Sequence, residues 1–314
     1  MNSQESDRLP NDIAIRANTA NDQISSARQL EGTIVHRILY GWLNDDEAAS
    51  YLAQIAKDPN HYQSLIDRHQ AMKSNIAQRQ QYDASSAELA DESGWGLDDV
   101  RQQPGIAALI AQDFRIGLVD VNQIIAIQKS VKLTGLDERI QLAATNKASL
   151  TELCLPTDIT HSPRALVDPD GRAITLSSPN PNFRIMDMRM DEVDYSIAPG
   201  SPAIKMHAVS IVVGATQSFV HVTHYNGRYY LKDGYHRSVG LLRANTSAIP
   251  CLISEALSLE QLAIGSGGIS VDVLLGDHPP TLSDYLDDSV SGEGLMADTL
   301  KVVRVSGEEF NVSG

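Results

Sequence analysis

The segment Leu231–Asn245, LKDGYHRSVGLLRAN, is the part of this sequence whose residue types and spacing best suit chemistry. An Asp-Gly pair precedes Tyr-His-Arg-Ser, and an apolar run follows. A strand that ends at Asp233-Gly234 and turns into a helix leaves the first N–H groups of that helix unpaired. Those donors and the positive end of the helix dipole form an anion site. The segment therefore predicts a site for the phosphate groups of a ligand.

Each residue of this turn has a chemical reason to contact a phosphate. Glycine lets a ligand approach the backbone closely, and the arginine fork matches phosphate oxygens. The residues that we predict to bind phosphate are Gly234, Tyr235, His236, Arg237 and Ser238. Asp233 could hold a metal ion, a ribose hydroxyl or the guanidinium of Arg237. The alternative is structural: Asp233 is only a helix cap, and Arg237 only pairs with a surface carboxylate.

The same turn contains the candidate catalytic residues. If a bound nucleotide is turned over, Asp233 or His236 is the candidate general base, and Arg237 stabilises charge on the phosphoryl group. We predict no metal site, because His221 and His224, three apart on a strand, point to opposite faces. Cys251 follows Ile-Pro in a buried strand and is expected to be an inert core thiol.

Local signals predict the elements that position the turn. FVHVTHYNGRYYL reads as a hairpin, because Asn226-Gly227 suits a two-residue turn with positive φ at both positions. YHRSVGLLRA reads as a helix, and Asn245 stands where a left-handed C-cap residue is needed. AIPCLI follows as a strand. Strand, helix and strand at this spacing predict a βαβ unit with a right-handed crossover.

The string YYLKDGYHRSVGLLRANTSAIPCLI resembles the ParB/sulfiredoxin superfamily, in which a hairpin strand leads into a Gly-x-x-Arg turn. The similar part covers residues 203–253. The resemblance implies a small mixed sheet that binds a nucleoside triphosphate, ATP or CTP with Mg²⁺, at the turn. It also implies that Gly234, His236 and Arg237 contact the phosphates.

Departures from that pattern limit the functions that we expect. Sulfiredoxins have a cysteine between the glycine and the His-Arg pair, whereas this chain has Tyr235, which argues against sulfinic acid repair. ParB proteins continue into a basic helix-turn-helix domain, whereas GDHPPTLSDYLDDSVSGEG is acidic. Nucleotide binding, with hydrolysis or phosphoryl transfer to a small molecule, is the leading hypothesis. A protein-interaction scaffold with a degenerate ParB-like module is the alternative, and a DNA-associated regulator is third.

Composition favours a globular protein and disfavours nucleic acid as a partner. The 314 residues include 42% apolar residues and have a net charge of −15, which repels phosphate backbones. Two cysteines without metal-site spacing fit a reducing compartment. The polar N-terminus has no signal-like apolar stretch, and AVSIVVGA is too short to span a bilayer. We expect a soluble, cytoplasmic protein of bacterial type, with no membrane association.

The chain is expected to be an α+β protein in three parts. Residues 1–29 are predicted to be disordered, 30–103 to be helical, and 104–314 to form a ParB/sulfiredoxin-like α+β domain with an acidic, solvated C-terminal extension. Within the helical part, Asn44 and Glu47 predict a capping box. The apolar stripe of 62–72 predicts core packing, and residues 44–81 offer a protein partner its surface. Residues 153–200 are expected to be mostly loop, with one strand at RAITLSS.

Overall fold

The computed structural model describes residues 33–83, 85, 87–132, 137–156, 163–178, 183–196, 198, 201–215, 218–262, 264–265, 267–297, 301–309 and 311. The predicted disordered segment 1–29 lies outside these residues. The chain divides into two compact units, Met1–Ile34 with Met296–Asp298, and Val35–Leu295 with Thr299–Gly314. The boundary that the sequence predicts near residue 103 falls inside the second unit.

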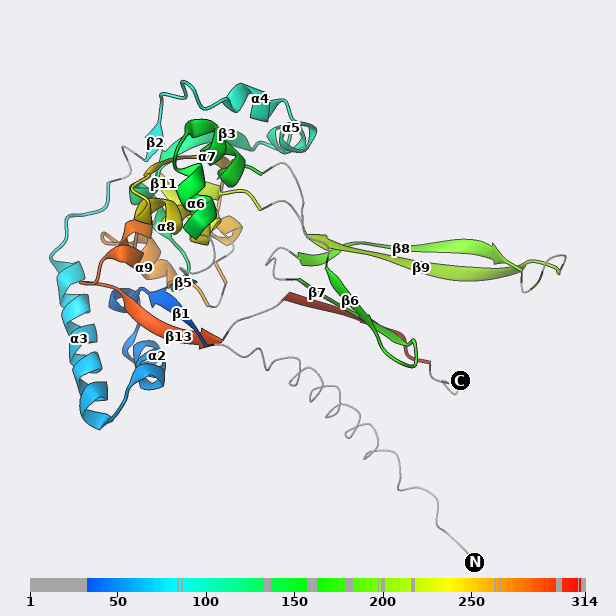
Figure 1. Cartoon of the computed structure of the whole chain (residues 1–314), viewed down its shortest axis with the longest axis horizontal. Helices are drawn as coiled ribbons and strands as arrows, with labels where there is room; N and C mark the ends of the chain where they lie inside the picture. Colours follow the sequence, from blue (N-terminus) through cyan, green and yellow to red (C-terminus); the bar gives the residue numbers. More distant parts are fainter. Residues whose placement is uncertain are drawn as a thin grey trace, which may run out of the picture. The chain divides into compact units, whose positions relative to one another are not determined.

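A six-stranded mixed sheet positions the candidate site (Figure 1). Its strand order is β2-β3-β12-β10-β11-β4. The strands are β2 (Glu88–Leu89), β3 (Arg115–Asp120), β12 (Ala248–Glu255), β10 (His221–Tyr225), β11 (Arg228–Asp233) and β4 (Ile125–Ala126). The fold is therefore α+β with a mixed sheet, as expected.

The strand pairing corrects the predicted βαβ unit. Helix α8 (Tyr235–Arg243) follows β11 and leads into β12, but β12 pairs in parallel with β10, whereas β10 and β11 are antiparallel. Strand β12 is therefore antiparallel to β11 and separated from it by β10. The prediction was wrong because β12 begins at the same end of the sheet at which β11 finishes, and the sequence pattern does not record the end to which a helix returns the chain.

Two left-handed residues confirm the local turn predictions. Asn226 and Gly227, between β10 and β11, have φ values of 50° and 73°. Asn245, after α8, has φ 58°. Asparagine tolerates this region better than other side chains do, so it can end a helix where glycine is usual.

The N-terminal helices are α2 (Asp45–Ile55) and α3 (Pro59–Ala77). Asn44 caps α2, since its side chain accepts a hydrogen bond from the Glu47 N–H at 2.9 Å. The predicted capping box is incomplete, because the Glu47 carboxylate instead accepts from Lys129 Nζ at 2.5 Å. His69 and Met72 of α3 are buried, and the stripe packs on the core as predicted.

A second sheet has the order β13-β1-β5, from β13 (Gly292–Ala297), β1 (Thr33–Ile38) and β5 (Ser130–Lys132). Strand β13 lies in the predicted acidic, solvated extension, so that part of the prediction was wrong. Val290 and Ser291, just before β13, are fully buried. The segment is acidic in composition, but Val290 and Ser291 within it are small or apolar and are buried in the core.

Two further β units occupy the region predicted to be mostly loop. One is a three-stranded sheet in the order β14-β7-β6, from β14 (Lys301–Ser306), β7 (Ala173–Ser178) and β6 (Arg164–Val167). The other pairs β8 (Phe183–Tyr195) with β9 (Ile204–Ala215) over twelve residue pairs. The sequence predicts β7 at RAITLSS, part of β9 at AVSIVV and β14 at KVVRVSGEEFNV, but neither β6 nor β8.

The remaining elements are short. They are α4 (Leu97–Arg101), α5 (Pro104–Ile110), α6 (Asp137–Ala143), α7 (Lys147–Cys154), α9 (Val271–Leu275), and the 3₁₀ turns η1 (Tyr40–Trp42), η2 (Val121–Gln123), η3 (Leu259–Leu262) and η4 (Leu282–Leu286). One apolar cluster contains residues from α2, α3, the six-stranded sheet and α8. No helix in the described part of the chain is long and apolar enough to cross a membrane.

Arg79, just after α3, forms ion pairs with two aspartates in and just after η4. Its Nη1 donates to Asp284 Oδ1 at 2.6 Å, and its Nη2 donates to Asp287 Oδ2 at 2.6 Å. The guanidinium carbon lies 5.5 Å from the centroid of the Trp42 ring. The Asp284 side chain is only 7% exposed, so this ion pair is largely shielded from water.

We expect Arg79→Ala to lower the free energy of unfolding by about 3 kcal/mol, because it leaves the Asp284 carboxylate buried without its cation. Lys73→Ala is the matched control. Lys73 pairs with Asp45 at 2.9 Å, but both side chains are well exposed, so we expect a loss below about 1 kcal/mol. Urea unfolding of both variants measures the difference, and equal losses would contradict this account.

Candidate functional site

Gly234 begins α8 in a conformation that other residues rarely adopt. Its φ is 94°, and as a glycine it supplies no side chain to cap the helix start. A Cβ atom placed on Gly234 would lie 2.9 Å from Val220 Cγ2 and 3.0 Å from Val220 Cα. The close approach that requires glycine is thus to Val220, and this contact alone explains the residue.

Tyr235 points into the core. Its side chain is 3% exposed, and its hydroxyl donates to the Leu231 carbonyl at 2.8 Å. The same oxygen accepts from the N–H groups of Ile127 and Gln128, at 2.7 and 3.2 Å. These bonds join β11 to the chain that follows β4. Only the backbone of Tyr235 is placed to contact a ligand at the helix start.

Arg237 connects α8 to two neighbouring segments. Its Nη1 donates to the Ser218 carbonyl at 2.6 Å and to the Leu153 carbonyl at 3.1 Å, and its Nη2 donates to Ser218 Oγ at 2.8 Å. Through these bonds the guanidinium holds the end of α7 and the residues just before β10 beside the turn.

Asp233 stabilises the turn from the other side. Its Oδ1 accepts from the Gly234 N–H at 2.7 Å, and its Oδ2 accepts from Ser218 Oγ at 3.0 Å. Asp233 pairs with His221 across the hairpin, and Lys232 is the extra residue of a β-bulge beside that pair. Bulges of this kind redirect side chains next to functional sites.

The first turn of α8 separates His236 from Ser238. His236 is exposed, whereas Ser238 is fully buried and its hydroxyl has no hydrogen-bond partner among the described residues. Of the predicted phosphate-binding side chains, His236 is therefore the one that the turn presents to solvent.

Two residues that sequence reasoning missed complete the site. His36 of β1 and Lys132 of β5 are direct partners across their strand pair, and β5 packs against α8. Both are close enough to His236 to act on its protonation. The resulting basic cluster consists of His36, Lys132, His236 and Arg237, with Asp233 as its acidic neighbour. No local signal marks His36 or Lys132, since each stands alone in its segment.

This environment lowers the pKa of His236. Partial burial is the largest cause, followed by the positive charges of His36, Lys132 and Arg237, and the Asp233 carboxylate opposes them. Burial also lowers the pKa of Lys232. A neutral imidazole at neutral pH can accept a proton or donate one hydrogen bond, so His236 is suited to act as a general base.

The cysteines do not take part in this chemistry. Cys154 and Cys251 are both fully buried. Burial raises the pKa of the Cys154 thiol to about 12 and that of Cys251 well above its ordinary value. Cys251 is thus the inert core thiol that the sequence predicts. No group of three or more metal-ligating residues occurs within the described ranges.

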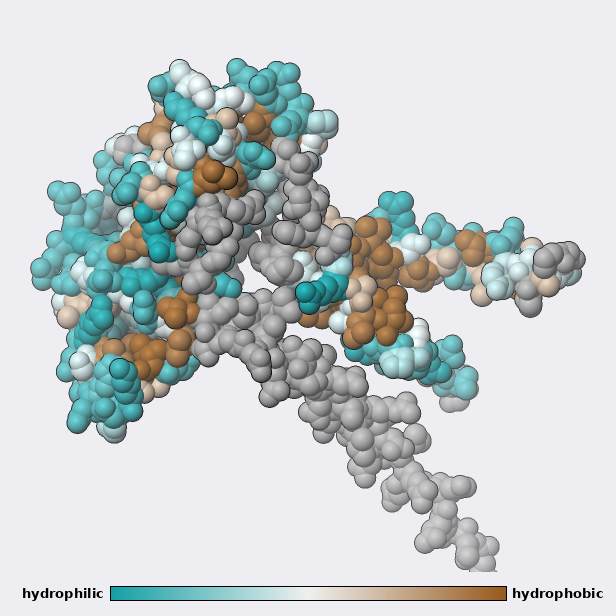
Figure 2. Space-filling model, viewed as in Figure 1, coloured by the Kyte–Doolittle hydropathy of each residue, from teal (hydrophilic) through white to brown (hydrophobic). Residues whose placement is uncertain are grey.

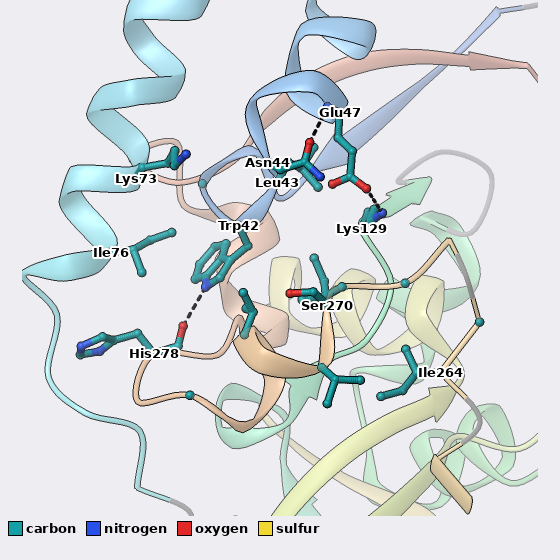
Figure 3. Close-up of a pocket in the computed structure, with 17 residues that line it drawn as sticks. Trp42, Leu43, Asn44, Glu47, Lys73, Ile76, Lys129, Ile264, Ser270 and His278 are labelled. Carbon is teal, nitrogen blue, oxygen red and sulfur yellow. Dashed lines mark hydrogen bonds and ion pairs between the residues drawn. The ribbon is translucent and has the colours of Figure 1, made fainter. Parts of the chain in front are cut away.

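A cavity of about 710 Å³ lies elsewhere, between the α2–α3 region and the segment 264–278 (Figure 3). Trp42, Ile76 and Ile264 line it, and the Trp42 indole N–H donates to the His278 carbonyl at 2.7 Å. Lys73 and the Glu47–Lys129 ion pair stand at its polar side. None of the residues Asp233–Ser238 lines this cavity. It offers an apolar site that is separate from the basic cluster.

A scan against protein-family models and searches of curated proteins and solved structures find no match to this chain.

We expect Arg237→Ala to lower the free energy of unfolding by about 2–3 kcal/mol, since it leaves the Leu153 and Ser218 carbonyls without a charged donor. His236→Ala, one residue earlier and exposed, should change it by no more than about 0.5 kcal/mol. Urea unfolding without any ligand checks both values. A small effect of Arg237→Ala would show that the guanidinium does not hold the fold.

The stability of the protein should also depend on pH through His221. Burial lowers the pKa of His221 from 6.5 to about 4. The unfolded chain then binds a proton at His221 below about pH 6.5 and the folded chain only below about pH 4, so the stabilisation is complete above pH 6.5 and is lost as the pH falls to 4. The full effect is about 3 kcal/mol.

His221→Gln removes this titration and leaves a polar side chain facing Ser254, whose Oγ lies 2.9 Å from His221 Nε2. The free energy of unfolding of the wild type should fall more steeply than that of the variant as the pH is lowered from 7 to 4.5. Parallel pH profiles for the two proteins would contradict the assignment.

Proposed function

We propose that this chain binds the phosphate groups of a nucleoside triphosphate at the start of α8. The observation that carries the proposal is the basic cluster, in which His36, Lys132 and His236 gather beside a helix whose N-cap residue is glycine. Backbone N–H groups and basic side chains that converge in this way suit a polyphosphate. The sequence resemblance to ParB/sulfiredoxin proteins points to the same ligand class.

In this proposal the residues of the turn have different tasks. The first N–H groups of α8 and the side chains of Lys132 and His236 contact the phosphates. Arg237 and Asp233 position the turn through their bonds to Ser218. Tyr235 anchors the helix start in the core.

Turnover is the second part of the proposal. The lowered pKa of His236 lets it accept a proton from a water or hydroxyl nucleophile, which would give hydrolysis or phosphoryl transfer. Asp233 suits this task less, because both its carboxylate oxygens already accept hydrogen bonds within the turn. For the same reason Asp233 does not fit as a Mg²⁺ ligand, and we derive no step through a metal ion.

We expect thermal unfolding with ATP, CTP, GTP or UTP to show a raised midpoint for at least one nucleotide, since a ligand of the folded state stabilises it. Lys132→Met should weaken binding of that nucleotide roughly tenfold or more, because one charge-assisted contact is worth about 1.5–3 kcal/mol. Isothermal titration calorimetry measures the affinity. Arg237→Ala is unsuited to this test, because it also destabilises the fold.

Lys73→Met is the control. If it weakens nucleotide binding and Lys132→Met does not, the ligand occupies the cavity beside Trp42, and the proposal for the α8 turn is wrong. If no nucleotide raises the midpoint, nucleotide binding itself is refuted.

A further inference from the structure

The hairpin of β8 and β9, called the ribbon below, exposes an unusual amount of apolar surface (Figure 2). Ten of the 20 exposed large apolar side chains in the described part of the chain lie on it, each between 39% and 69% exposed. By contrast, α2 and α3 are described along their whole length and expose no such side chain. The ribbon is therefore the larger exposed apolar surface of the two.

The longest continuous run of apolar side chains lies on one face of the ribbon. Residues that pair across antiparallel strands share a face. On this face, called the Met face, the pairs from base to tip are Phe183–Ala215, Ile185–Val213, Met188–Ile211, Met190–Val209, Glu192–His207 and Asp194–Lys205. Phe183 at the base is buried, so the free apolar run is the six residues of the pairs Ile185–Val213, Met188–Ile211 and Met190–Val209, followed by four polar residues at the tip.

The opposite face has the reverse order. Its base carries Asp187, Arg189 and Asp191 with the exposed Val212 among them, and its tip carries the apolar pairs Val193–Met206 and Tyr195–Ile204. The continuous apolar run is four residues here and six on the Met face, so the Met face is the better interface.

At the tip of the Met face, the acidic and the basic residues lie on different strands. The acids Glu192 and Asp194 both belong to β8, whereas Lys205 and His207 both belong to β9. Lys205 also pairs with Glu192 within the chain. A surface with acids along one edge and bases along the other can complement a copy of itself.

We propose that two copies of this chain associate through the Met faces of their ribbons, about a twofold axis parallel to the strands. Such an axis places β8 of one copy over β9 of the other, so acids meet bases at the tip. It also places base over base, so Met188 and Met190 meet Val209 and Ile211 of the other copy. A twofold axis across the strands would instead set the apolar base against the charged tip.

The ribbon needs such a partner for physical reasons. A two-stranded hairpin is marginally stable in water unless a face of it is covered. Met190 is 69% exposed and Val209, its cross-strand partner, is 61% exposed. A stable interface covers roughly 800 Å² on each partner, and a stripe of this length can supply an area of that order. The apolar stripe provides affinity, and the charged tip selects the orientation.

Sedimentation velocity on the full chain tests the association. We expect a dimer for the wild type, and a dissociation constant raised at least roughly tenfold in Met190→Lys, which places a charge at the centre of the interface. Val193→Lys, on the opposite face, is the matched control and should stay dimeric. A monomeric wild type, or equal effects of the two variants, would overturn the proposal.

Exchange of charges tests the axis. Glu192 of one copy should lie over His207 of the other. Glu192→Lys and His207→Glu should each weaken the association of the variant with itself, because each change places like charges opposite one another. A mixture of the two variants should form mixed dimers with a lower dissociation constant than either variant shows alone in sedimentation velocity. Equal association in the mixture and in the single variants would refute this orientation.

Discussion

The contact between Gly234 and Val220 is the constraint on which the candidate site depends. The backbone of the turn approaches Val220 so closely that no side chain fits between them. Val220 is itself held by two backbone bonds of 2.8 Å: its N–H donates to the Cys154 carbonyl, and its carbonyl accepts from the Leu252 N–H. The start of α8 is therefore fixed against α7 and β12 at one point. A larger residue at 234 would move the helix start away from both.

The polar residues of the turn fall into two groups. Some form hydrogen bonds that hold the start of α8 in place, and one faces solvent. Tyr235, Arg237 and Asp233 are each committed to bonds within the protein, and together they join β11, α7 and the start of β10. His236 is the side chain of the turn that remains exposed. The sequence motif Asp233–Ser238 suggests six ligand-binding residues. In the structure most of them form a rigid support for the side chain of His236. Rigid support of this kind keeps a contact group in place without loss of entropy on binding.

The sequence predicts the parts of this fold that local chemistry determines. The Asn226-Gly227 turn, the Asn245 cap and the start of α8 each follow from the backbone preferences of one or two residues. His36 and Lys132 reach the site through strand pairing between distant segments, which no local pattern records. The first strand of the ribbon does carry a local signal, because Asp187, Arg189 and Asp191 alternate with methionines in the period of two of a strand. The prediction of a loop gave more weight to the many Pro, Asn and Asp residues of this region.

The net charge of −15 shapes how the basic cluster can work. A strongly acidic protein repels anions at long range, so the cluster cannot steer a polyphosphate from a distance. Salt at physiological strength screens charges beyond about 8 Å, which removes most of that repulsion while leaving contacts within the site nearly intact. Binding would therefore depend on direct donors at the α8 start and on Lys132, with an association rate that rises with ionic strength. The same net charge disfavours nucleic acid, whose many phosphates carry repulsion far beyond the cluster. A small, compact polyanion, as proposed above, brings fewer negative charges and keeps them within reach of the direct donors.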